Sequence, residues 1–104
     1  MHDGAVTAEE MQAGDVRPLS AARPGDRGVI VHVGDHSRHG VLAAEELERR
    51  LLELGFVEGA AIELLHEGMI GGDPIAVRVD DMRVALRRLE ASAIDVRFES
   101  GSKL

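Results

Sequence analysis

The stretch that most constrains the fold is residues 50–59, RLLELGFVEG. Gly55 can adopt at no steric cost the left-handed conformation that commonly ends a helix, and Phe56 is then placed to contact the preceding turn and close the cap. The pattern predicts a short helix over about residues 43–54, followed by a turn that Gly59 ends and a strand that begins directly after it. Its apolar face repeats at the helical spacing i, i+4 and i+7: Leu47, Leu51 and Leu54.

The rest of the chain is dominated by short β patterns. Turn signals separate five segments with strand-like sequence: residues 28–33, 60–67, 75–79, 82–86 and 94–98. Strands at this spacing are typical of a small barrel or sandwich, and a single helix after the first strand has to cover an open end or edge. The fold class predicted is mainly β, a small SH3-like barrel of about five strands with one inserted short α-helix. An OB-type barrel fits the same pattern.

The sequence also predicts local structure in one of these strands and in two of the segments between them. In the first strand, strict alternation places Val29, Val31 and Val33 on one face, with Ile30 and His32 on the other. Residues 68–74, GMIGGDP, read as a glycine-rich loop between two strands, without the lysine and hydroxyl residue of a phosphate-binding loop. Residues 89–93 predict a single helical turn.

Length and composition favour one small domain with tails. Residues 1–16 are small and acidic and are expected to form a flexible tail, residues 17–98 the domain, and residues 99–104 a flexible end. The final Ser102-Lys103-Leu104 matches a peroxisomal address, or is simply part of that end. The sequence has no apolar run near the roughly 18 residues of a membrane span and no secretory signal, so no membrane insertion and a cytoplasmic location are expected.

Charge and side-chain inventory exclude several function classes. The net charge of −7 and the presence of only two aromatic residues argue against nucleic acid as a partner, because such binding needs a basic face or stacking rings. The absence of cysteine excludes disulfides and thiolate sites. No nucleophile motif is present, and adjacent acidic residues point apart along a helix or strand, so we expect no enzyme. A small basic group interrupted by apolar residues reads as solvated rather than as a phosphate site: Arg83, Arg87 and Arg88.

A cluster of imidazole and carboxylate groups is the one candidate metal site. These types of ligand suit Zn²⁺ or Fe²⁺, and His66 could approach from a neighbouring strand. The alternative is a set of exposed loop histidines, because a loop has to be ordered by the metal before its ligands converge. No cofactor is otherwise required. The cluster comprises His32, Asp35, His36 and His39.

From Leu19 to Val96 the chain resembles the FeoA family, the small cytosolic partners of the bacterial FeoB ferrous-iron transporter. Glu58 stands where the family commonly has proline, and Asp81 where it often has glycine in a hairpin, without loss of either turn. The matching pieces keep a consistent order and spacing: Leu19-Ser20 with Gly25, Arg50-Leu51 with Leu54-Gly55 and Gly59, Gly72-Asp73-Pro74, and Ala85-Leu86-Arg87 with Ala91 and Ile94.

The resemblance implies a non-enzymatic SH3-like barrel that supports ferrous-iron uptake by contacting the cytoplasmic G domain of a FeoB-type transporter. The alternative is a metal-sensing regulatory module, like the SH3-like domains at the end of iron- and manganese-dependent repressors. Oligomeric state is left open. Candidate contacts lie on the helix with its following turn and on the glycine-rich loop: Arg50, Leu54, Phe56, Met69, Ile70 and Asp73.

Overall fold

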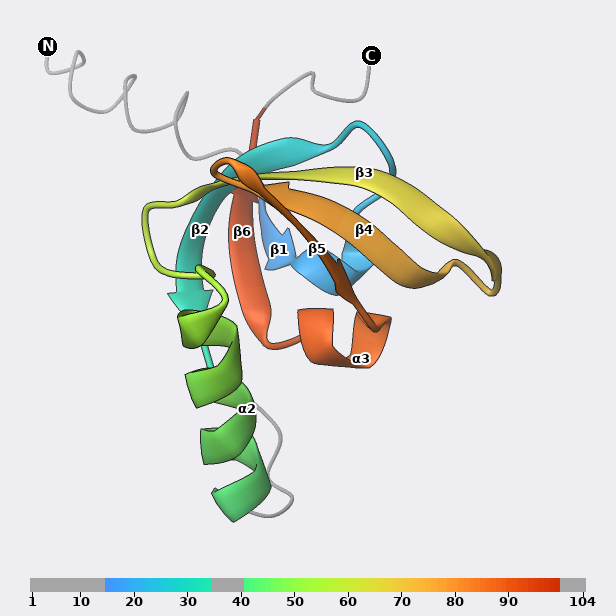
Figure 1. Cartoon of the computed structure of the whole chain (residues 1–104). Coiled ribbons are helices and arrows are strands. Elements are labelled where there is room, and N and C mark those ends of the chain that lie inside the picture. The colour runs from blue at the N-terminus through green and yellow to red at the C-terminus, as the bar shows by residue number, and fades with distance from the viewer. Residues whose placement is uncertain (1–14, 35–40, 100–104) are drawn as a thin grey trace, which may run out of the picture.

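The computed structural model describes residues 15–34 and 41–99 (Figure 1). Within these ranges the strands form one antiparallel sheet in the order β1-β6-β2-β3-β4-β5, which confirms the prediction of a mainly β fold. In chain order the elements are β1 (Asp15–Pro18), the 3₁₀ turn η1 (Leu19–Ala21), β2 (Arg27–Val33), α2 (Val41–Glu53), β3 (Ala61–Ile70), β4 (Asp73–Val79), β5 (Met82–Leu86), α3 (Arg88–Ala91) and β6 (Ile94–Phe98).

The N-terminal strand β1 adds a sixth strand to the five that the sequence patterns predict. Its residues Asp15 and Val16 fall in the segment expected to be a tail, yet they pair with Phe98 and Arg97 of β6. The guanidinium of Arg17 also lies 4.6 Å from the centre of the Phe98 ring. These contacts join residues about eighty positions apart, so no local pattern announces the strand. The rest of residues 1–16, and residues 100–104, lie outside the described ranges.

Helix α2 ends as the sequence predicts. Gly55 has φ of +104°, and its N–H donates to the Leu52 carbonyl at 3.0 Å. The Phe56 N–H donates to the Leu51 carbonyl at 3.0 Å, so the two bonds form a Schellman cap. The side chains of Leu51 and Phe56 are fully buried in the core. Figure 1 shows the rest of α2 extending away from the sheet.

Strand β2 departs from the strict alternation predicted for it. Its pairing with β6 shifts register between Ile30 and His32, the mark of a β-bulge. The bulge changes which side chains face the core: Ile30 and Val33 are buried, whereas Val29 is exposed. The prediction that Val29, Val31 and Val33 share a face was therefore wrong, because one extra residue reverses the alternation downstream.

The predicted loop at residues 68–74 is instead the end of a hairpin. Strand β3 continues through Ile70, and Gly71 and Gly72, with φ of +67° and +77°, make the turn into Asp73. Gly68 belongs to the strand, where a Cβ atom would lie 1.9 Å from the Asp73 carbonyl oxygen. Glycine here serves close strand approach as well as turning, and sequence pattern alone cannot separate the two uses.

The remaining predicted elements are confirmed. Strand β4 alternates as expected, with Ile75, Val77 and Val79 buried, and β5 returns as its hairpin partner. At the turn between them, Asp80 carries the positive φ, of 52°, rather than Asp81. The helical turn expected over residues 89–93 is α3.

Candidate functional site

Two apolar side chains stand out at the end of the β3–β4 hairpin. Met69 is 97% exposed and Ile70 85% exposed, compared with 42% for Val29, and among the other large apolar residues that the structure describes only Leu89 on α3, at 81%, is similarly exposed. We call Met69 and Ile70 the tip pair. Figure 1 shows the hairpin that carries them reaching out from the body of the sheet. An exposed apolar pair on a projecting element is typical of an interaction site.

Arg88, the first residue of α3, braces this hairpin. Its Nε donates to the Gly72 carbonyl at 2.9 Å, and its Nη2 donates to Oε1 of Glu67 at 3.0 Å. Its Nη1 reaches the Ser20 carbonyl at 2.6 Å, and its backbone N–H donates to Oδ1 of Asp73 at 2.7 Å. A single planar fork of donors thus ties the hairpin to α3 and to η1. The tip pair is consequently displayed at the end of a braced hairpin rather than on the glycine-rich loop that the sequence predicts.

This role of Arg88 was missed by sequence reasoning, which grouped it with Arg83 and Arg87 as solvated charge. Arg83 and Arg87 are exposed, but the Arg88 side chain is only 23% exposed. Its partners lie 15 to 68 residues away along the chain. No local signal distinguishes it from the other two arginines, because the contacts exist only after the hairpin, α3 and η1 have come together.

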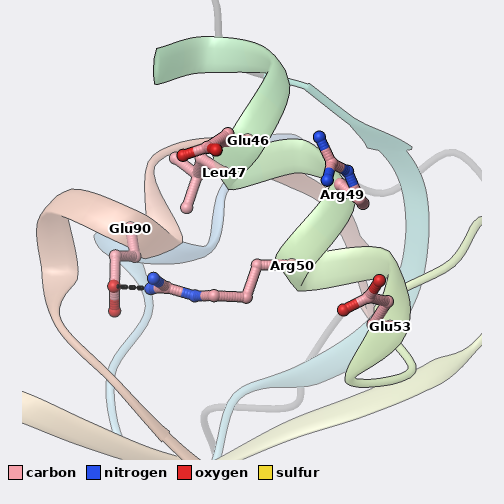
Figure 2. A pocket seen from close by; sticks show the side chains of 6 residues that line it. All are labelled: Glu46, Leu47, Arg49, Arg50, Glu53 and Glu90. Atoms are coloured by element: carbon pink, nitrogen blue, oxygen red, sulfur yellow. Dashed lines mark hydrogen bonds and ion pairs between the residues drawn. The ribbon is translucent and has the colours of Figure 1, made fainter. Parts of the chain in front are cut away.

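The remaining predicted contact residues lie in three different environments. Arg50 on α2 forms an ion pair with Glu90 on α3, beside a groove of about 470 Å³ (Figure 2). Leu54 is half-buried against the core, and the Asp73 carboxylate is occupied by the Arg88 N–H. Phe56 is fully buried and offers no surface to a partner, so its role is in the helix cap and the core. The groove is lined by Glu46, Leu47, Arg49, Arg50, Glu53 and Glu90.

The metal cluster expected from the sequence falls largely outside the described ranges, since Asp35, His36 and His39 all lie in the gap. His32 is exposed on β2, in register with Asp95 of β6. His66 is not its neighbour: the β2–β3 pairing covers residues 27–29, and the two histidines lie beyond opposite ends of it. In residues 15–34 and 41–99, no group of three or more His, Cys, Asp or Glu side chains is arranged to hold a metal ion.

No helix in the described part of the chain combines the length and apolar character needed to cross a bilayer.

Residues 17–98 match the FeoA domain. A curated relative, the Fe(2+) transport protein A/Fe(2+) transporter FeoB fusion protein of Porphyromonas gingivalis (strain ATCC BAA-308 / W83), is 36% identical over 84 residues. The match covers 81% of this chain but 9% of that protein, so the chain spans only a small part of the relative's length. In that relative, the FeoA-like region and the FeoB transporter are parts of one polypeptide.

Solved structures agree with the sequence match. The structure of Stenotrophomonas maltophilia FeoA complexed with zinc, a procaryotic SH3 domain protein, is 33% identical, covers 79% of this chain and 94% of its own, and has a TM-score of 0.63. A manganese-dependent transcriptional repressor is 26% identical, with 81% of this chain and 42% of the repressor covered and a TM-score of 0.66. The predicted SH3-like fold is confirmed. The chain belongs to the FeoA domain family.

Proposed function

We propose that this protein is a non-enzymatic accessory protein of ferrous-iron uptake that acts in the cytoplasm by contacting a FeoB-type transporter at its cytoplasmic G domain. The main support is the fused relative, in which the two partners are parts of one chain. Fusion raises the local concentration of one part around the other, which is useful where the separate proteins have to meet. Two further features of the surface fit a role in protein–protein contact.

The first feature is the tip pair on its braced hairpin. Met69 and Ile70 present apolar area to a partner, and the Arg88 bonds hold the hairpin before binding, which lowers the ordering cost of association. The second feature is the net charge of −7, which favours a basic surface on the partner. Arg50, which pairs with Glu90 at the groove between α2 and α3, is a further candidate contact.

Calorimetry between the full chain and the soluble G domain of the FeoB-type transporter from the same organism tests this proposal. We expect the wild type to bind and the Met69→Ser/Ile70→Ser variant to lose about tenfold or more in affinity. The reason is that losing two apolar side chains that become buried in the complex costs more than about 1.4 kcal/mol. Val29→Ser, at a moderately exposed residue on β2, is the matched control and should bind as the wild type does. Absence of binding by the wild type would contradict the contact function. Equal affinity of the Met69→Ser/Ile70→Ser and Val29→Ser variants would show that the tip pair is not part of the contact surface.

A second candidate function is a metal-sensing module. It is favoured by the zinc complex of the Stenotrophomonas relative and by the likeness to the manganese-dependent repressor. Titration with ferrous iron, manganese and zinc, on the wild type and on His36→Ala/His39→Ala, separates it from the first. Tight one-to-one binding that the double substitution abolishes would support the metal module, whereas weak binding unaffected by it would leave the contact function as the better account.

A further inference from the structure

Strand β5 ends the sheet. The strand order places β4 on one side of it and, within residues 15–34 and 41–99, no strand on the other. All five residues of β5 pair with β4 without a register shift, so the strand is regular along its whole length. A regular edge strand presents a row of unpaired backbone groups to which another extended chain can bind.

The hydrogen-bond pattern identifies the backbone groups that face the free side. The N–H of Asp80, the residue directly after β4, donates to the Ala61 carbonyl of β3 at 2.9 Å, so the backbone faces β3 at this position. Backbone direction alternates from residue to residue in an antiparallel sheet, so Val79 faces its register partner Met82 on β5. The same alternation turns the N–H and C=O groups of Arg83 and Ala85 away from β4, toward the free edge.

The side chains beside this edge carry a definite pattern. On the outer face of β5 the exposed residues Arg83 and Ala85 are followed by the exposed Arg87. Arg78 of β4 lies directly across from Arg83 and is held only loosely by Glu63, at 3.8 Å. The outer face of the edge is therefore basic in a protein of net charge −7.

The inner face of the same edge is apolar and incompletely covered. Met82 is 50% exposed, and Val84 is only partly buried although it packs against the core. A strand added beside β5 would place alternate side chains next to these two residues and the others next to the arginines. The pattern on the two faces thus specifies the chemistry of a matching strand.

We propose that the β5 edge binds an extended segment of a protein partner, one with acidic side chains alternating with apolar ones, by adding it to the sheet. The backbone of Arg83 and Ala85 supplies the hydrogen bonds. The acidic side chains meet Arg83, Arg87 and Arg78, and the apolar ones cover Met82 and Val84. This surface is distinct from the tip pair, because Met82 to Leu86 lie on the far side of β4 from β3.

A fluorescein-labelled peptide of sequence TEVEVET is a direct probe. We expect its fluorescence anisotropy to rise on addition of the full chain, and amide hydrogen exchange at Arg83 and Ala85 to slow by about tenfold at saturation, because both groups become bonded. A lysine analogue, TKVKVKT, and a rearranged peptide with contiguous acids, EEETVVT, are the controls. Equal binding of the rearranged peptide, or unchanged exchange at both amides, would overturn the proposal.

Two substitutions separate backbone addition from simple charge attraction. Ala85→Pro removes an outward N–H without touching the β4 ladder, so it should weaken TEVEVET binding by about tenfold, while Ala85→Ser keeps the N–H and should bind as the wild type. Arg83→Glu should weaken binding by a similar factor, and Arg97→Glu, on interior strand β6, should not. Unimpaired binding by a folded Ala85→Pro variant, judged by circular dichroism, would overturn the proposal, because the peptide would then bind by charge attraction without the outward N–H.

Discussion

Among the described residues, Arg88 makes the largest number of side-chain hydrogen bonds, and these bonds reach two separate parts of the molecule, the β3–β4 hairpin and the η1 segment. Its donors bond to Gly72, Glu67, Ser20 and Ala22, while its own N–H bonds to Asp73. The guanidinium group suits this role because its five donors are fixed in one plane. A compact ammonium group could not reach the same carbonyls at once, so arginine is required here for its shape as much as its charge.

We predict that Arg88→Ala lowers the free energy of unfolding by about 1–3 kcal/mol, because several partly buried acceptors lose their donor. Arg88→Lys should recover only part of this loss. Urea unfolding of the purified variants measures both effects. Arg83→Ala, at an exposed position on β5, is the matched control, and we expect it to change stability by about 0.5 kcal/mol or less. Equal stability of the Arg88→Ala and Arg83→Ala variants would contradict the bracing role.

At the scale of the element, α2 shows how a helix attaches to a barrel through one end. Its C-terminal cap and its buried face use the same residues: the Leu51 carbonyl accepts the Phe56 N–H, and both side chains lie in the core. Packing of this end holds the helix, since an isolated helix of 13 residues is marginal in water. The cap and the core contact therefore stabilise each other.

Neighbouring leucines of α2 test this account. Leu51 is fully buried and Leu52 is 41% exposed, although the two side chains are identical and adjacent. We predict that Leu51→Ala destabilises the protein by about 2–5 kcal/mol, the cost of a buried cavity, and Leu52→Ala by less than about 1 kcal/mol. Chemical denaturation of both variants gives the comparison. Similar losses for the two would mean that the helix end does not pack as described.

At the scale of the whole molecule, two helices far apart in sequence are joined across a groove. Figure 2 shows the Arg50 side chain extending from α2 toward Glu90 on α3. The Glu90 carboxylate also accepts the Arg87 N–H at 3.0 Å, which fixes it at the start of α3. The contact relates the projecting helix to the element whose first residue braces the hairpin, so both candidate contact regions adjoin α3.

We predict that this ion pair contributes little to stability. The Arg50 side chain is 58% exposed, and exposed pairs are worth about 0–1 kcal/mol because water and salt screen them. A double-mutant cycle with Arg50→Ala and Glu90→Ala, measured by thermal or urea unfolding, should give a coupling within this range that falls in high salt. A larger coupling that resists salt would mean that the groove is effectively dry around the pair.

Much of the fold could be predicted because its signals are local. The leucine spacing and Gly55 identify α2 and its cap, and the alternation of Ile75, Val77 and Val79 identifies β4. The candidate site could be predicted from the sequence only in part. The sequence predicts the tip pair as contact residues, but on a loop rather than a hairpin, and it predicts Phe56 as a contact residue although this side chain is fully buried in the core.

The amino-acid sequence by itself determined the mainly β fold with its one inserted helix, because hydrophobic periodicity and glycine position act over a few residues. Only the tertiary structure decided the pairing of β1 with β6, the bulge in β2 and the place of Arg88. Each of these depends on bonds between segments distant in sequence. Their partners are chosen when the chain packs, so identical residue types, such as Arg83 and Arg88, end in opposite roles.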